Sequence, residues 1–198
     1  MKIAVLGWGS LIWCPGALAM KERWRPSGPT LEIEFARISS DGRLTLVLHP
    51  SPTQVRTYWV LSACDSVAEA RENLRRREGT RLDRIAHASL GDGSAVPSLH
   101  GSAICEWLQE TAQLDAVIWT ALETNWNEIR RAPFSCDDAV RYLEELRGSD
   151  EAAYRRAAEY IRNAPAQTQT PLRERLKSNK AFRPAELSQG LFEDTPAP

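Results

Sequence analysis

The sequence lacks a long hydrophobic run. No apolar stretch in its 198 residues approaches the roughly 18 residues that a membrane-spanning helix needs. The apolar start is too short for the hydrophobic region of a secretory signal, is interrupted by Gly7 and Gly9, and is not followed by a small-residue cleavage site. We therefore expect a soluble, cytoplasmic protein.

An excess of charge of one sign is also missing. The 25 Lys and Arg residues are balanced by 26 Asp and Glu residues, for a formal net charge of -1. A chain with this balance has no electrostatic reason to bind nucleic acid or an anionic membrane. We expect neither as a partner, and a small, roughly neutral ligand is easier to accommodate.

Cysteine and histidine are scarce, with four Cys and three His. Cys14, Cys64, Cys105 and Cys136 form no CxxC pair and have no His at metal-ligand spacing. The pattern therefore favours neither a zinc site nor a disulfide framework, and we expect four buried, reduced thiols and no bound metal. The seven Trp residues, by contrast, are many for this length, and we interpret them as core packing and pocket walls.

Hydrophobic periodicity predicts a mixed α/β chain. A helix is best marked at "SVAEARENLRRREG", where Ser66 and Glu69 have the spacing of a capping box and Gly79 is placed as a C-terminal stop. Two amphipathic helices, each opened by a Ser cap, predict a helical hairpin over 135–148 and 149–165. Strands are predicted over 2–8, 31–38, 43–49, 55–62 and 115–122, and further helices over 97–113 and after Pro171.

The opening stretch "KIAVLGWGSLIW" raises three interpretations. A dinucleotide fingerprint needs a third glycine inside a helix, but Ile12 stands there and Pro15 would end such a helix almost at once. A nucleophile elbow needs GxSxG, but Gly9 directly precedes Ser10 and Ile12 replaces the second glycine. Two possibilities stay open: a backbone nest that binds a carboxylate or an oxyanion, and a tight turn with no ligand.

Two short motifs give this chain a family resemblance. "LGWGSLIW" followed by "CPG" resembles the glycine loop of the γ-glutamylcyclotransferase-like proteins, above all their glutathione-degrading branch, and "LRRREG" places Glu78 where that family has its catalytic glutamate. "FARIS", with Arg37, lies between them in the expected order. The family's usual Tyr is Trp8 here, which removes a hydroxyl group and adds bulk to the pocket wall.

The resemblance implies a fold and an architecture. It implies a mixed α/β fold around a small, partly closed β-barrel of the γ-glutamylcyclotransferase type, with flanking and C-terminal helices. We expect this domain over residues 1–134, a C-terminal helical extension packed on it over 135–180, and a flexible tail over 181–198. The packing face of the extension would include Val140, Leu143, Tyr154 and Ile161.

The resemblance also implies an activity. The family cyclises a small γ-glutamyl amine or peptide to 5-oxoproline and releases the amine, without a cofactor. Glu78 would be the catalytic base, and the substrate-binding residues would be Trp8, Gly9, Ser10, Leu11 and Arg37. The identity of the γ-glutamyl compound and the oligomeric state stay open.

Each of these residues also has a simpler interpretation. The negative end of the helix dipole and any burial would raise the pKa of Glu78 into a range useful for a base, but Glu78 could instead pair with Arg75 on a solvated helix end. Arg37 could face solvent from its strand, and Cys14 is expected to be inert. The corresponding alternative function is a non-catalytic module that binds a carboxylated metabolite or a protein partner. A nucleotide-dependent oxidoreductase is a more distant alternative.

Overall fold

The computed structural model describes residues 1–91, 99–111 and 113–183. Within these ranges the chain is mixed α/β, as predicted, with two sheets and six α-helices. It divides into two compact units. In the described chain, unit 1 contains residues 1–31 and 56–122, and unit 2 contains residues 32–55 and 123–183.

Unit 1 is built on a four-stranded sheet. Its strand order is β5 (Tyr58–Leu61), β1 (Ile3–Gly7), β7 (Ala116–Thr120) and β6 (Ile85–Ser89). The central strand β1 pairs antiparallel with β5 and parallel with β7, and every residue of it is buried. A strand covered on both faces reads as a continuous apolar run, which explains the unbroken "IAVLG".

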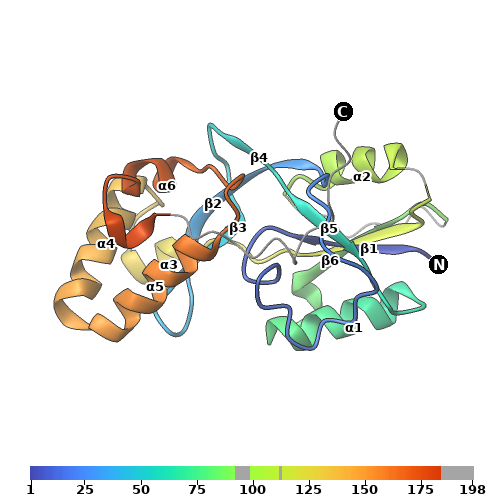
Figure 1. The fold of residues 1–198 in the computed structure, drawn as a ribbon, viewed down its shortest axis with the longest axis horizontal. Helices are drawn as coiled ribbons and strands as arrows, with labels where there is room; N and C mark the ends of the chain where they lie inside the picture. The colour runs from blue at the N-terminus through green and yellow to red at the C-terminus, as the bar shows by residue number, and fades with distance from the viewer. Residues whose placement is uncertain (92–98, 112, 184–198) are drawn as a thin grey trace. The chain divides into compact units, whose positions relative to one another are not determined.

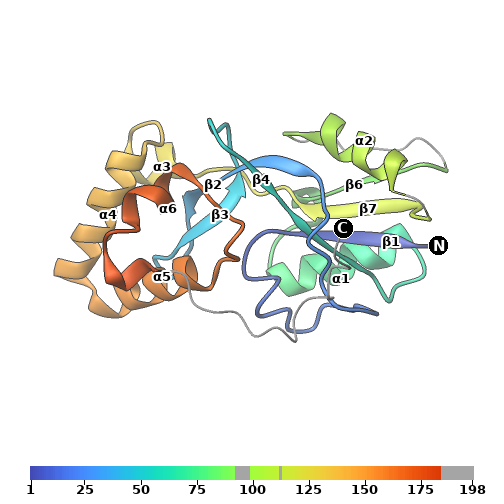
Figure 2. The same cartoon turned by 45° about the horizontal axis from the view of Figure 1, so that its top comes forward.

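Two helices cover this sheet. Helix α1 (Val67–Glu78) and helix α2 (Gly101–Glu110) lie on opposite sides of it (Figures 1 and 2). Helix α1 has the predicted ends: the Ser66 hydroxyl accepts a hydrogen bond from the Glu69 N–H, and Gly79 adopts a left-handed φ of 61°. Ala70 and Leu74 are buried on its inner face, so α1 is fixed against the sheet by its apolar side.

Unit 2 combines a small sheet with helices. The sheet has the order β3 (Leu44–Leu48), β2 (Thr30–Ile38), β4 (Gln54–Arg56). The helices are α3 (Trp126–Arg130), α4 (Cys136–Ser149), α5 (Glu151–Asn163) and α6 (Pro171–Leu176), followed by the 3₁₀ turn η2 (Lys180–Phe182). Helices α4 and α5 form the predicted hairpin, but the predicted Ser cap of the second helix is wrong, because Asp150 caps α5 and Ser149 is the last residue of α4. Leu143 and Ile161 are buried, whereas Val140 and Tyr154 are half-buried.

The helical extension packs on the sheet of unit 2. The Tyr142 hydroxyl donates to the Gly42 carbonyl at 2.8 Å, and helix α5 packs against β3. The expected boundary at residue 134 does not coincide with the division into units, because 123–134 belongs to unit 2 together with 32–55. At the start of the expected 181–198 tail, Phe182 is buried against Tyr154. The rest of that tail, 184–198, lies outside the described residues.

Several details differ from the sequence predictions. Strand β6, helix α3 and the 3₁₀ turn η1 (Leu82–Arg84) were not predicted, and the predicted strand 55–62 is divided at Thr57. The helix predicted over 97–113 is shorter, and residues 97, 98 and 112 of that prediction lie outside the described residues. Neither sheet closes into a barrel in the described ranges. No described helix has the length and apolar character needed to cross a membrane.

Candidate functional site

The chain leaves β1 at Gly7 and turns without forming a helix. The Ile12 N–H donates to the Gly9 carbonyl at 3.0 Å, and the Cys14 N–H donates to the Ser10 carbonyl at 2.8 Å. These two bonds fold the chain back after β1, and we call residues 8–13 the glycine loop. The prediction that no long helix starts here is confirmed. At Gly7 a side chain would clash, since a Cβ there would lie 2.7 Å from the Trp24 ring.

The glycine loop carries three backbone donors in succession. In the described part of the chain, the N–H groups of Gly9, Ser10 and Leu11 donate no hydrogen bond. Gly9 and Leu11 are buried and Ser10 is half-buried. Backbone donors withdrawn from water are almost always paired, because an unpaired one costs free energy. Three such donors in one turn can therefore take an oxygen atom of a bound carboxylate or carbonyl group.

Apolar side chains anchor the glycine loop. Leu11 and Ile12 belong to the same buried cluster as Leu74 of α1. Trp8 is also buried, with 6% of its surface exposed. The loop backbone is thereby held on the side of unit 1 that α1 covers.

Glu78 is the last residue of α1 and is largely withdrawn from solvent. It follows the fully buried Leu74 by four residues, so the two side chains share one face of the helix. Only 18% of the Glu78 side chain is exposed. Burial raises the pKa of Glu78, and the Arg77 guanidinium opposes part of this rise through its charge and a hydrogen bond. A raised pKa suits a carboxylate that takes up and returns protons.

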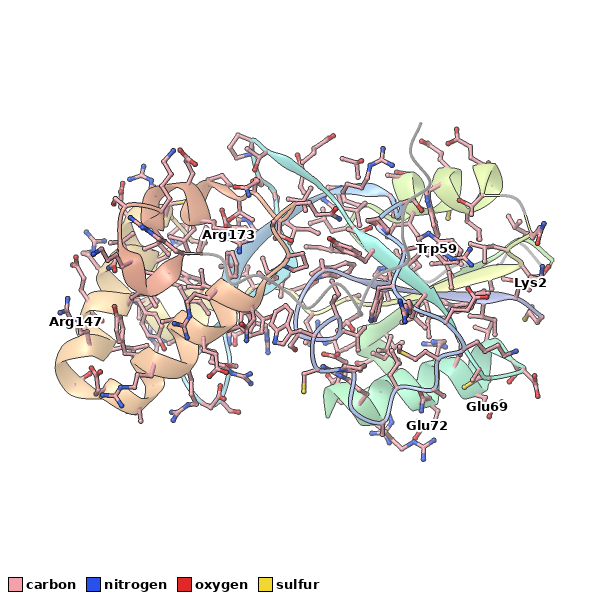
Figure 3. The ribbon with its side chains drawn as sticks, viewed as in Figure 1. Lys2, Trp59, Glu69, Glu72, Arg147 and Arg173 are labelled. Carbon is pink, nitrogen blue, oxygen red and sulfur yellow. The ribbon has the colours of Figure 1, made fainter. Side chains whose placement is uncertain are left out.

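The interpretation of Glu78 as a partner of Arg75 is wrong. Arg75 makes a two-bond ion pair with Glu72 on the solvent side of α1, with both nitrogen–oxygen distances at 2.7 Å. Figure 3 shows Glu72 projecting from α1 away from the sheet. Glu78 instead accepts a 2.7 Å hydrogen bond at Oε1 from its neighbour Arg77. Among the described residues, no other group bonds to the Glu78 carboxylate.

Helix α1 and the chain after the glycine loop are joined by two side chains. Asn73 donates to the Ala17 carbonyl at 3.1 Å and accepts from the Ala19 N–H at 2.9 Å. One turn later, Arg77 donates to the carbonyls of Cys14 and Pro15. The sequence indicated that Arg77, together with Arg75 and Arg76, could oppose a rise in the pKa of Glu78, but its contacts to the loop and the role of Asn73 were not predicted. The i, i+4 spacing of Asn73 and Arg77 puts both on one helix face.

Arg37 belongs to the other compact unit. It lies on β2 in unit 2, where its Nη1 donates to the Glu123 carbonyl at 2.7 Å. Unit 1 contains both the glycine loop and Glu78 but does not contain this arginine. Its role in substrate binding therefore stays a prediction.

The remaining candidates are the four cysteines and groups of side chains that could hold a metal ion. All four cysteines are free, but the prediction that all are buried is wrong: Cys64 is buried, Cys14 is exposed, and Cys105 and Cys136 are half-buried. Cys14 is exposed because it lies in the turn after the glycine loop. Across the described ranges, no three His, Cys, Asp or Glu side chains gather where they could hold a metal ion.

Comparisons with protein-family models, with curated proteins and with solved structures found no match to this chain. The family resemblance of the two motifs stays a prediction. The geometry of unit 1 is therefore the basis on which we infer a function.

Proposed function

We propose that this protein is a cofactor-free γ-glutamyl cyclotransferase-type enzyme. It converts a small γ-glutamyl amine or peptide to 5-oxoproline and the released amine. The observation that carries the proposal is the combination, in one compact unit, of the partly buried Glu78 carboxylate with three unpaired backbone donors of the glycine loop. The proposal includes the fold of that family, a small, partly closed β-barrel.

The chemistry needs one proton acceptor and one oxygen-binding site. Glu78 takes a proton from the substrate's α-ammonium group, and the resulting amine attacks the γ-carbonyl carbon. As the five-membered ring closes, the attacking nitrogen releases its second proton to water, the bond from the γ-carbonyl carbon to the leaving nitrogen breaks, and Glu78 returns the first proton to this leaving nitrogen. The N–H groups of Gly9, Ser10 and Leu11 hold the γ-carbonyl oxygen or the substrate carboxylate.

Ring closure explains how so few groups suffice. Nucleophile and electrophile are on one molecule, so a substrate held in a bent conformation gains the high effective molarity of an intramolecular reaction, up to ~7–11 kcal/mol of the barrier. The protein's main tasks are to bend the substrate and to move one proton. Neither task requires a bound metal or a redox group.

A second candidate is a non-catalytic module that binds a carboxylated metabolite. The Arg77–Glu78 ion pair favours it, because a carboxylate already paired with arginine is also what a structural role would produce. In that case the glycine loop would bind a carboxylate and Glu78 would take no part in chemistry.

A screen of γ-glutamyl amines and peptides separates the two candidates. The full chain is incubated with each compound, and 5-oxoproline is measured by liquid chromatography and mass spectrometry. The enzyme releases 5-oxoproline from at least one compound with repeated turnover. Binding of carboxylated compounds in calorimetry without 5-oxoproline release from any compound would overturn the proposal in favour of the module.

A further inference from the structure

We propose that Arg77 is the positioning residue of this site, holding the Glu78 carboxylate and the main chain after the glycine loop with a single guanidinium group. This inference rests on the proposed function, in which Glu78 is the base. All three nitrogens of the Arg77 head group are used. Nη1 donates to Glu78 Oε1 at 2.7 Å, Nε donates to the Pro15 carbonyl at 3.3 Å, and Nη2 donates to the Cys14 carbonyl.

The residue type matches this arrangement. Arginine offers five N–H donors in a rigid planar fork, whereas lysine has one nitrogen on a flexible stem. Only 11% of the Arg77 side chain is exposed, so the cation is nearly as withdrawn from water as the carboxylate it contacts. A buried charge is costly unless it is paired and hydrogen-bonded, and Arg77 is paired with Glu78 and donates a hydrogen bond from each of its three nitrogens.

The pairing leaves the carboxylate able to react. Arg77 bonds to Oε1, and among the described residues Oε2 of Glu78 accepts no hydrogen bond. A free oxygen is what a base needs to receive a proton. Arg77 also opposes, through its charge and its hydrogen bond, part of the rise that burial causes in the pKa of Glu78.

A simpler interpretation is that Arg77 only fastens the loop to the helix. Asn73 provides a test of this, because it fastens the same segment to α1 through Ala17 and Ala19 and does not contact Glu78. A purely structural role predicts that losing either side chain has the same kind of effect. A positioning role predicts that only Arg77 changes the titration of Glu78.

The experiment compares Arg77→Met, Arg77→Lys and Asn73→Ala in the full chain. The Glu78 side-chain carboxyl carbon is followed by ¹³C NMR titration, assigned by its absence in Glu78→Gln, and kcat and KM are measured across pH. In Arg77→Met we expect the Glu78 titration and the acidic limb of kcat to move to higher pH. At pH values below the limb, kcat falls by about tenfold for each unit that the limb moves. Arg77→Lys, which keeps the charge, recovers part of the shift.

Asn73→Ala is expected to lower the melting temperature without moving the titration or the acidic limb. An unchanged Glu78 titration in both Arg77 variants, or an equal shift in Asn73→Ala, would overturn the positioning role. If Arg77→Met does not fold, Arg77→Lys against Asn73→Ala decides the question. If the parent protein releases no 5-oxoproline, the proposed function fails, while the NMR titration still decides whether Arg77 controls Glu78.

Discussion

Each compact unit contains one buried or nearly buried glutamate, and the two differ in their hydrogen bonds. Glu34 of unit 2 is 2% exposed, and its Oε1 accepts from the Phe35 N–H at 2.7 Å and its Oε2 from the Leu172 N–H at 3.2 Å. Thr170 adds a side-chain hydrogen bond. Among the residues that the structure describes, Glu78 of unit 1 accepts a hydrogen bond only from Arg77. Burial raises the pKa of both carboxyl groups.

The comparison separates a structural carboxylate from one available for chemistry. Glu34 accepts hydrogen bonds from its own strand, from Leu172 of α6 and from the Cys136 thiol of α4, so it ties these elements together. Glu78 has one oxygen without a partner among the described residues, in the unit that also holds the unpaired N–H groups of the glycine loop. A raised pKa alone does not indicate function, since both residues have one.

Among the changes that test this comparison, truncation of the chain before Ser135 is expected to destabilise the protein most. It removes Leu172 and Thr170, the partners of Glu34 on α6, and the helices whose buried residues Leu143 and Ile161 complete the core of unit 2. Exposing such an apolar surface should sharply lower solubility and the melting temperature. A truncated protein with the solubility and melting temperature of the full chain would show that these helices are an independent appendage.

Glu34→Ala should cost the next largest amount of stability. It leaves the buried N–H groups of Phe35 and Leu172 without an acceptor, at about 1–3 kcal/mol each. The free energy of unfolding in urea should therefore fall by roughly 2–6 kcal/mol. Glu144→Ala, at an exposed position of α4, is the control and should stay within about 0.5 kcal/mol of the parent. Equal stability of the two variants would contradict the structural role.

Asp138 is a carboxylate of unit 2 whose pKa is lowered instead of raised, and its contribution to stability can be tested by changing the pH. Hydrogen bonds from Arg130 and from Trp126 Nε1 lower its pKa to about 2. The resulting stability is present above the ordinary pKa of 3.8 and is lost as the pH falls toward 2, because the unfolded state binds the proton first. The loss should be about 2 kcal/mol in acid unfolding curves, and Asp138→Asn should remove it. If the free energy of unfolding falls by the same amount in the parent and in Asp138→Asn over this pH range, the stabilising role of the Asp138 carboxylate is contradicted.

The contribution of Glu34 to stability should change with pH in the opposite direction to that of Asp138. We expect this to be the smallest of the effects. Because its pKa is raised above 4.5 in the folded state, its contribution to stability is complete below that pH and declines as the pH rises through the folded pKa. The free energy of unfolding of the parent minus that of Glu34→Gln should decrease between pH 4.5 and 7. A difference that stays constant over this range would mean that burial does not penalise the charged form.

Local signals in the sequence were enough to predict α1 and the hairpin α4–α5. Ser66 and Ser135 both accept the predicted cap hydrogen bonds, and Gly79 ends α1 as expected. Strand β6 was missed because "IAHAS" has no alternating pattern and contains two alanines, which have low strand propensity. Its pairing with β7 creates the strand, and such pairing is a tertiary effect.

The candidate site was predictable only in part. Glu78 and the glycine loop were found through their motifs, but the Arg77 contacts depend on the path of residues 14–19, which no local pattern encodes. Glu34 was missed because "LEIEFARI" alternates and assigns it to the polar face. Residues 33–36 are all buried, and the register of β2 on β3 shifts between Glu34 and Arg37. A bulge of this kind cannot be read from composition.

The rate of 5-oxoproline release by Glu78→Gln tests the central claim most directly. Gln keeps the volume and the hydrogen-bonding capacity of Glu but cannot accept the proton, so kcat should fall by about 10²–10⁴ while substrate binding is largely kept. Arg75→Gln, which removes the pair with Glu72 and a hydrogen bond to the Thr80 carbonyl but no bond to Glu78, is the control and should retain the parent kcat. Release of 5-oxoproline by Glu78→Gln at the parent rate, from a compound that the parent accepts, would contradict the assignment of Glu78 as the base.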